Sequence, residues 1–166
     1  LDIIVGIQQT KSREDEFVYI KPYYESLSYR FFSLVKNKNS ITKYEDLREK
    51  LIGVNRHAKY FSPFDSDETL QKVSTSSLQQ NIDLLLYGRT MAFIHYEESV
   101  LPKLVDLNLT SKISKTVYQP QHIIKHYIAI SNKSHLMNLR KKLQELVKTG
   151  IGNGDFIKIR QAHYGR

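Results

Sequence analysis

The sequence predicts an α/β fold with mostly parallel sheets, because short apolar segments of β-forming residues alternate with helical patterns along most of the chain. In its middle part we expect strands near residues 30, 53, 72, 92 and 115, with helices between them. A chain of 166 residues can form one domain or two small lobes. Its hydrophobic fraction of 40% and its charged fraction of 25% are typical of a globular chain that buries a core.

Two strands are predicted within the first 24 residues. The apolar run at 3–5, closed by Gly6, suits a buried strand. The segment Phe17–Ile20 suits a second strand. We expect this strand to end at Pro22, because proline cannot donate a hydrogen bond to a sheet.

The polar loop between these strands, Gln8–Glu16, is the first candidate for ligand contact. A loop carried by the ends of buried strands often presents binding groups. Its Arg13 has the side chain best shaped to hold a carboxylate, through two parallel hydrogen bonds. The alternative is that Arg13 is a solvated charge beside the acidic residues 14–16, in ion pairs that contribute little.

The next elements follow at the spacing of an α/β chain. Residues 27–35 favour a long strand. Thr42 is expected to cap a short helix, with Glu45 as the second half of a capping box. Residues 51–55 form the following strand, and residues 56–61 are expected to begin a helix at its carboxyl end.

The rest of the chain shows the apolar spacing of helices, the alternation of strands and glycines at helix ends. In order, these patterns predict a strand at 70–73, a helix that begins after Thr75 or Ser76 and ends at Gly88, a strand at 90–95, a helix at 97–107 kinked at Pro102, strands at 112–118 and 122–131, a helix at 134–148 that Gly150 stops, and a last short helix with Phe156 and Ile159.

The composition narrows the classes of partner. A net charge of +8 and a pI near 9.5 favour anionic partners. The densest basic clusters, Lys36–Lys38 and Arg140–Lys142, lack interleaved aromatic residues, so we interpret them as solvated faces and expect no nucleic acid. The chain contains no cysteine, which excludes disulfides and thiolate metal sites, and we expect neither metal nor cofactor.

The first 24 residues also carry a resemblance. A buried strand runs into the loop Thr10-Lys11-Ser12-Arg13, and a second strand ends in an aromatic-rich Pro-Tyr segment, Phe17–Tyr24. In these motifs the chain resembles the bacterial periplasmic solute-binding proteins of the polar amino-acid type, which have the type 2 periplasmic binding fold. Further landmarks follow in the same order, namely Asp46-Leu47, Ile52-Gly53-Val54, Leu85-Leu86-Tyr87-Gly88-Arg89, Ala92-Phe93-Ile94, Tyr127-Ile128-Ala129-Ile130-Ser131 and Gly150 between the last helices.

The resemblance implies two lobes that the chain crosses between twice. Residues 1–26 and 122–166 would form a discontinuous, partial lobe 1, and residues 27–121 would form lobe 2. Compared with the family, the amino-terminal part of lobe 1 is absent from this chain. We therefore expect uncovered apolar sheet surface around Ile3–Val5 and Tyr127–Ile130. Its consequence would be self-association through the incomplete lobe, exchange of segments between chains, or a companion fragment that supplies the absent part.

The resemblance also assigns residues to the ligand, in a cleft between the lobes. The matching arginine of the family holds the ligand's carboxylate, which implies Arg13 together with Gln8 and Thr10. The turn after Gly53-Val54 normally offers backbone N–H groups at a helix N-terminus, and this chain has Arg56, His57 and Lys59 there. The family's ammonium-binding aspartate aligns with Tyr96, so a ligand without an amino group fits better, unless the strand slips by one residue and Glu97 replaces the aspartate. The alternative is that His57 and Lys59 face solvent and Tyr96 packs against the opposite lobe.

The implied function is capture of a small anionic or amino-acid-like ligand, one that bears a carboxylate, by a periplasmic protein that delivers it to an ABC transporter permease. One alternative is the ligand-sensing domain of a membrane signalling protein. Another is an enzyme, a hydro-lyase on the same fold, in which His57, His95, Glu97 and Glu98 form an acid–base pair. No nucleophile elbow, phosphate loop or His pair at metal-binding spacing occurs, and we expect a binding protein and no enzyme.

Overall fold

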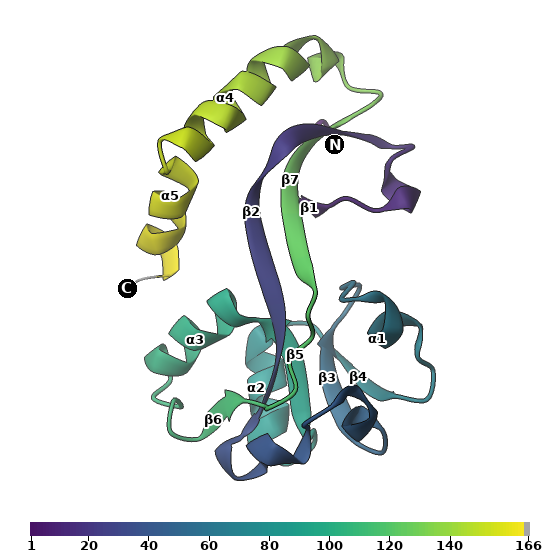
Figure 1. The fold of residues 1–166 in the computed structure, drawn as a ribbon, viewed down its shortest axis with the longest axis vertical. Coiled ribbons are helices and arrows are strands. Elements are labelled where there is room, and N and C mark those ends of the chain that lie inside the picture. Colours follow the sequence, from purple (N-terminus) through teal and green to yellow (C-terminus); the bar gives the residue numbers. More distant parts are fainter. Residues whose placement is uncertain (165–166) are drawn as a thin grey trace. The chain divides into compact units, whose positions relative to one another are not determined.

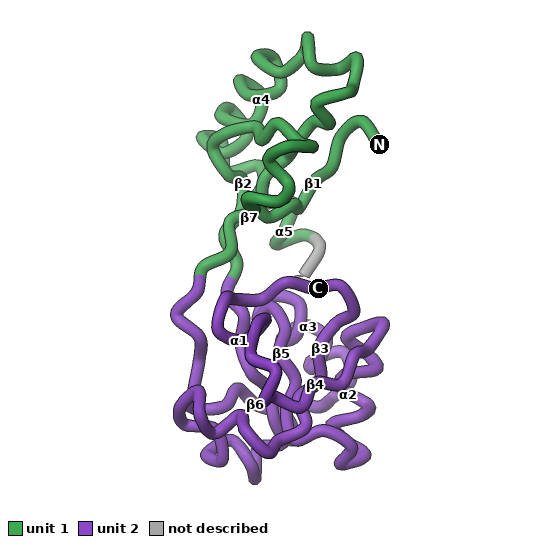
Figure 2. The backbone as a smooth tube through the Cα atoms, turned by 90° about the vertical axis from the view of Figure 1, so that its right-hand side faces the viewer, with its two compact units in different colours: residues 1–27, 123–166 green, residues 28–122 purple. Residues whose placement is uncertain are grey.

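A computed structural model describes residues 1–164 and confirms the α/β prediction (Figure 1). One path of paired strands has the order β1-β7-β2-β5-β3-β4, and β6 also pairs with β2. By contacts between Cα atoms the chain divides into two compact units, shown in Figure 2. Unit 1 contains 1–27 and 123–166, and unit 2 contains 28–122.

The sheet is mixed rather than mostly parallel. Strand β3 (Leu51–Asn55) pairs in parallel with β4 (Gln71–Thr75) and with β5 (Ala92–Tyr96). Strand β2 (Phe17–Leu34) pairs antiparallel with β5 and with β6 (Ile113–Lys115). In the described chain, parallel pairing thus joins the three strands that helical crossovers connect.

Unit 2 buries its core on both faces of this sheet. Helix α2 (Leu78–Leu86) and helix α3 (Glu97–Asp106) cover one face. Their core cluster contains Phe32, Ile82, Leu85, Phe93, Val100, Leu104, Leu109 and Ile113. On the other face, the fully buried Phe31 packs against Phe64 of the short helix α1 (Ser62–Ser66), with ring centroids 5.6 Å apart.

Unit 1 contains β1 (Ile3–Gln8), β7 (Ile123–Ser131) and the first part of β2, with β1 antiparallel to β7. Helix α4 (Arg140–Gly152) and helix α5 (Asp155–Tyr164) follow. The side chains alternate between two clusters, as expected for strands. One cluster is built on Ile20, Ile130 and Val147, and the other on Ile7, Tyr19, Tyr127 and Ala129.

A bulge in β1 sets the direction in which the strand enters the polar loop. The pairing register with β7 shifts between Val5 and Ile7, and Gly6 has φ +80°. Glycine adopts this left-handed conformation at little cost, and the extra residue turns the following side chains over. As a result Ile3 belongs to the cluster of Ile20 and Ile130, whereas Ile7 belongs to the opposite one.

The prediction that a strand ends at Pro22 is wrong, because β2 runs without interruption through that residue. The peptide bond between Lys21 and Pro22 is cis. Among the described strands, only β7 neighbours this part of β2. An edge strand tolerates proline, because the absent N–H group can face the unpaired side. The two strands expected at 17–20 and 27–35 are therefore a single strand of 18 residues.

Two helix ends also differ from the prediction. The segment Tyr44–Leu47 is a 3-10 helix, and Asp46 rather than Glu45 accepts hydrogen bonds from the backbone N–H groups of Thr42 and Lys43. Gly150 does not stop the penultimate helix, which continues to Gly152. The ring of Phe156 lies against Gly150, so the absence of a side chain there serves packing.

The apolar surface expected around β1 and β7 is only partly present. Val5 is 63% exposed, as expected for uncovered sheet. Tyr127, Ala129 and Ile130 are buried, because the first two cluster with residues of β1 and β2 and Ile130 clusters with Val147 of α4. Across residues 1–164, the helices are too short or too polar to cross a bilayer.

Candidate ligand-binding site

The side chain of Arg13 is half-buried and is held by one hydrogen bond in unit 1. Arg13 lies in the 3-10 helix Lys11–Arg13 that follows β1. Its Nη1 donates to the backbone oxygen of Gln8 over 3.2 Å. No carboxylate lies within ion-pairing distance of Arg13 among residues 1–164. Arg13 thus forms no ion pair with the neighbouring acidic residues 14–16 in the described chain, and most of its N–H donors remain available to solvent or to a ligand.

Tyr19 completes the support of this loop. Its hydroxyl donates to the same Gln8 oxygen over 3.4 Å, and its ring meets Tyr127 edge-on with centroids 5.6 Å apart. Burial raises the pKa of Tyr19, and the charge of Arg13 opposes part of that rise. Tyr19 was not selected from the sequence, although alternation along β2 places it on the same face as Phe17.

The other two loop residues are differently placed. The hydroxyl of Thr10 lies 3.2 Å from that of Ser12, so it is engaged within the loop. Gln8 contributes its backbone carbonyl, which accepts from both Arg13 and Tyr19. Both Thr10 and Gln8 are half-buried. The loop therefore presents one guanidinium group, with Thr10 and Gln8 beside it in sequence.

In unit 2, the carboxyl end of β3 leads into a turn and not into a helix. The N–H group of Ala58 donates to the oxygen of Asn55 over 3.2 Å, and His57 has φ +62°. The N–H group of Arg56 already donates to Thr75 of β4 over 2.8 Å. The expected helix at 56–61, with an N-terminus for an anion, is therefore absent. The side chains of Arg56, His57 and Lys59 lie at or near the surface of this turn.

Three tyrosines gather at the same end of the unit 2 sheet. Tyr29 stacks on Tyr96, with centroids 4.4 Å apart and 14° between the rings, and its ring centroid lies 4.7 Å from that of Tyr60. The Tyr29 hydroxyl lies 2.8 Å from that of Tyr96 and 2.9 Å from the carbonyl oxygen of Lys59. Burial raises the pKa of Tyr60 to about 12, so this ring is neutral over the physiological range.

The acidic residue next to Tyr96 is already paired. The carboxylate of Glu97 accepts hydrogen bonds from Arg30 over 3.1 Å and from Lys115 over 2.6 Å. Burial alone raises the pKa of Glu97, but the bonds and charges of Lys115 and Arg30 outweigh it and lower the pKa. Glu97 therefore has two cationic partners, and its negative charge is compensated within unit 2.

The ring of His95 is poorly placed to exchange protons with a ligand. Its Nδ1 is buried without a hydrogen-bond partner in the described part of the chain. Burial lowers the pKa of His95, and a backbone hydrogen bond with Tyr96 opposes part of this shift. Over residues 1–164, no three His, Asp or Glu side chains are grouped so that they could hold a metal ion.

The structure brings together some of the predicted residues. Gln8, Thr10 and Arg13 share one loop of unit 1. In unit 2, Tyr96 is connected to Lys59 through Tyr29, while Arg56 and His57 belong to the same turn. Tyr29 and Tyr60 were not selected from the sequence. Their aromatic character alone does not separate them from ordinary core residues.

Comparisons with known proteins agree with this architecture. Neither a protein-family model nor a curated protein sequence matches the chain. Among solved structures, it is similar to an amino acid ABC transporter substrate-binding protein from Streptococcus pneumoniae bound to L-arginine. The TM-score is 0.80 at 15% identity, and the match covers 99% of this chain and 68% of that one.

Two further structures are similar over almost the whole chain. The GluR0 ligand-binding core from Nostoc punctiforme, in complex with L-glutamate, has a TM-score of 0.77 at 13% identity and covers 99% of this chain and 73% of that one. The periplasmic VFT2 domain of BvgS from Bordetella pertussis has a TM-score of 0.72 at 11% identity, with 98% and 67% covered. The chain thus has the fold of the type 2 periplasmic binding proteins, as the resemblance implied.

Proposed function

We propose that this chain belongs to an extracytoplasmic solute-binding protein that captures a small carboxylate-bearing ligand for an ABC transporter. Arg13 carries the proposal. It is half-buried, fixed through Nη1 to the Gln8 carbonyl, and has no carboxylate partner in the described chain. A guanidinium group in this state can form two parallel hydrogen bonds with an incoming carboxylate.

The two compact units would then be the partial lobe 1, near residues 1–26 and 122–166, and lobe 2, near 27–121. Thr10 and Gln8 would support the ligand beside Arg13. Arg56, His57 and Lys59 would add positive charge in lobe 2, and Tyr96 would offer an aromatic ring in place of an acid. In this proposal the protein acts in the periplasm, and its partner is a membrane permease.

The described groups support the binding function better than the hydro-lyase alternative. Catalysis needs a base that can accept a proton from the substrate. Glu97 is paired with Arg30 and Lys115, and the unpartnered Nδ1 of His95 is buried. The sensor alternative uses the same ligand chemistry as a transporter receptor, and the likeness to BvgS keeps it as the second candidate.

The test is a calorimetric comparison of Arg13 variants, after a thermal-shift screen of organic acids and amino acids. Arg13→Ala should lower the affinity for the best ligand by about ten- to a hundredfold, which is the contribution expected of one charge-assisted pair. Arg13→Lys should restore only part, because an ammonium group cannot form the two parallel bonds. Lys11→Ala in the same loop is the matched control, since Lys11 is exposed. Unchanged affinity in Arg13→Ala would refute the proposed site.

A further inference from the structure

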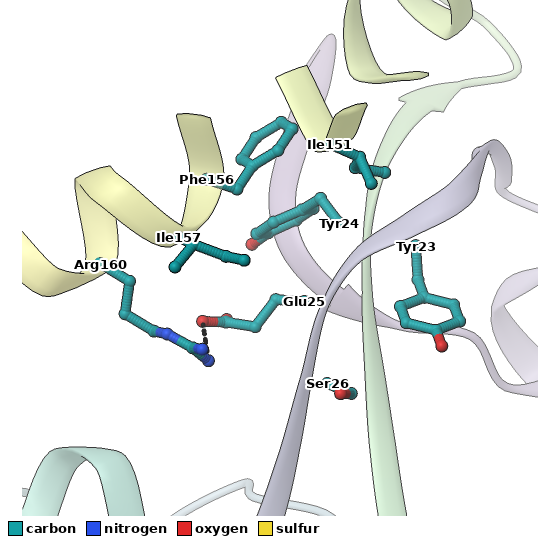
Figure 3. A pocket seen from close by; sticks show the side chains of 8 residues that line it. All are labelled: Tyr23, Tyr24, Glu25, Ser26, Ile151, Phe156, Ile157 and Arg160. Atoms are coloured by element: carbon teal, nitrogen blue, oxygen red, sulfur yellow. Dashed lines mark hydrogen bonds and ion pairs between the residues drawn. The ribbon is translucent and has the colours of Figure 1, made fainter. Parts of the chain in front are cut away.

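A cavity of about 230 Å³ lies in unit 1 between β2 and the two C-terminal helices. Figure 3 shows its lining, which includes Glu25 of β2 and Phe156, Ile157 and Arg160 of α5. None of the lining residues belongs to the Arg13 loop. The cavity is therefore distinct from the site proposed above.

The walls of the cavity are largely apolar. The ring of Tyr24 lies 5.0 Å from that of Phe156, with 33° between the ring planes, and Ile151 and Ile157 line the same space (Figure 3). Ile157 is 54% exposed, so solvent reaches this wall. A cavity of about 150 Å³ with an apolar lining admits benzene. The present volume has room for one ring and a short polar chain.

A charged pair forms the polar side of the cavity. Arg160 Nη1 donates to Glu25 Oε1 over 3.3 Å, and Nδ1 of His126 lies 3.3 Å from Glu25 Oε2. Each oxygen of Glu25 thus has a partner. The guanidinium group of Arg160 carries five N–H donors, and in the described chain Glu25 is its one side-chain hydrogen-bond partner.

The free N–H donors of Arg160 favour a negatively charged ligand. A cation at the remaining lone pairs of Glu25 would lie beside the positive charge of Arg160, whereas an anion can bind the free N–H donors of Arg160 and leave the pair intact. We propose that this cavity is a second binding site, which takes a small carboxylate with an aromatic or branched apolar body. The carboxylate binds Arg160, and the apolar body packs against Tyr24, Phe156 and Ile157.

The test uses phenylacetate as the probe and the 166-residue chain as the protein. Nuclear magnetic resonance titration should shift the backbone amide signals of Glu25, Ser26 and Ile157. Benzyl alcohol, which lacks the carboxylate, should bind at least about tenfold more weakly. Shifts confined to the loop at 8–13, the absence of shifts at millimolar phenylacetate, or equal binding of benzyl alcohol would overturn the proposal.

Variants separate this site from the Arg13 site. Arg160→Gln should lower the affinity for phenylacetate by about tenfold or more. The control is Lys158→Gln on the same helix, because Lys158 is paired only with Asp155 at the surface of the described chain, and it should leave binding unchanged. Ile157→Trp should block the cavity without altering its charges, which keeps the test valid if Arg160→Gln does not fold. Arg13→Ala should retain phenylacetate binding, and loss of binding in that variant alone would assign the probe to the Arg13 loop.

Discussion

The rings of Tyr29 and Tyr96 stack with centroids 4.4 Å apart, and their hydroxyl groups lie 2.8 Å from each other. The resemblance to polar amino-acid-binding proteins places an acidic group at the position of Tyr96, for the ligand's ammonium group. The neighbouring Glu97 is already paired with Arg30 and Lys115, so its negative charge is compensated within unit 2. An ammonium group brought to this place would lose its hydration without gaining a carboxylate partner.

The first prediction is that acids bind better than their α-amino counterparts. Glutarate should bind at least about tenfold more tightly than L-glutamate, because an unpaired buried charge costs more than one lost hydrogen bond. Tyr96→Asp should reduce or reverse this ratio. Tyr87→Asp is the matched control, since Tyr87 is 80% exposed. Calorimetry measures the two affinities in each protein. Tighter binding of L-glutamate than of glutarate in both the unaltered protein and Tyr96→Asp would contradict the prediction.

The second prediction concerns acid stability. Burial lowers the pKa of His95 below its ordinary value of 6.5, so the folded state favours the neutral ring. As the pH falls below about 6.5, the unfolded chain takes up this proton more readily, and the free energy of unfolding decreases until the pH passes the folded pKa. The stability supplied by the lowered pKa of Glu97 is also lost on acidification, but only below about 4.5.

His95→Gln should therefore make the free energy of unfolding less dependent on pH between about 7.5 and 5.5. Urea titrations at the two pH values measure this difference. His57→Gln is the control, because the side chain of His57 is exposed in a turn. An equal loss of stability on acidification in the unaltered protein and in His95→Gln would show that other groups are responsible.

The third prediction concerns Gly53 in the centre of the unit 2 sheet. A β-carbon at this position would lie 2.3 Å from Oδ1 of the buried Asn81 and 3.1 Å from the β-carbon of Phe93. Asn81 cannot easily move, because its Nδ2 donates to Asn55 over 2.7 Å. Gly53→Ala should lower the free energy of unfolding by about 1–3 kcal/mol, as for other overpacked cores.

The control for Gly53→Ala is Gly152→Ala at the end of α4. Beyond its own helix backbone and chain neighbours, no described atom would lie within 4 Å of a β-carbon at Gly152. Alanine favours a helix over glycine by up to about 1 kcal/mol, so this substitution should be neutral or stabilising. Thermal melts of the two variants compare them directly. A melting temperature of Gly53→Ala as high as that of Gly152→Ala would contradict the close packing around Gly53.

The elements with a local and repeated signal were predictable from the sequence. Short runs of β-forming apolar residues predicted the strands at 51–55 and 122–131, and helical spacing predicted the helix that ends near Gly88. These patterns arise from burial on one or two faces, which the order of apolar residues reflects directly. The resemblance likewise indicated the fold, because the landmarks keep their order along the chain.

The errors occurred where a neighbouring strand decides the outcome. Pro22 ends a strand only if its N–H group would be needed, and among the described strands β2 has one neighbour at that point. The segment 56–61 has helical composition, but its backbone is engaged by Thr75 and Asn55 in a turn. The pairing of Glu97 with Arg30 and Lys115 depends on β2 and β6, which are distant in sequence. Long-range pairing of this kind leaves no periodic pattern.

The last prediction concerns self-association through β1. This strand is at the end of the strand order and pairs only with β7 among the described strands, and its Val5 is 63% exposed. An unpaired, apolar edge recruits another strand, and a lysine on such an edge prevents it. Val5→Lys should therefore shift the protein towards the monomer.

Ile123→Lys is the matched control, because Ile123 is equally exposed but lies on β7, away from the free edge. Sedimentation velocity over a range of concentrations distinguishes the two. A monomer at every concentration for the unaltered chain, or equal effects of both lysines, would show that the edge of β1 does not drive association.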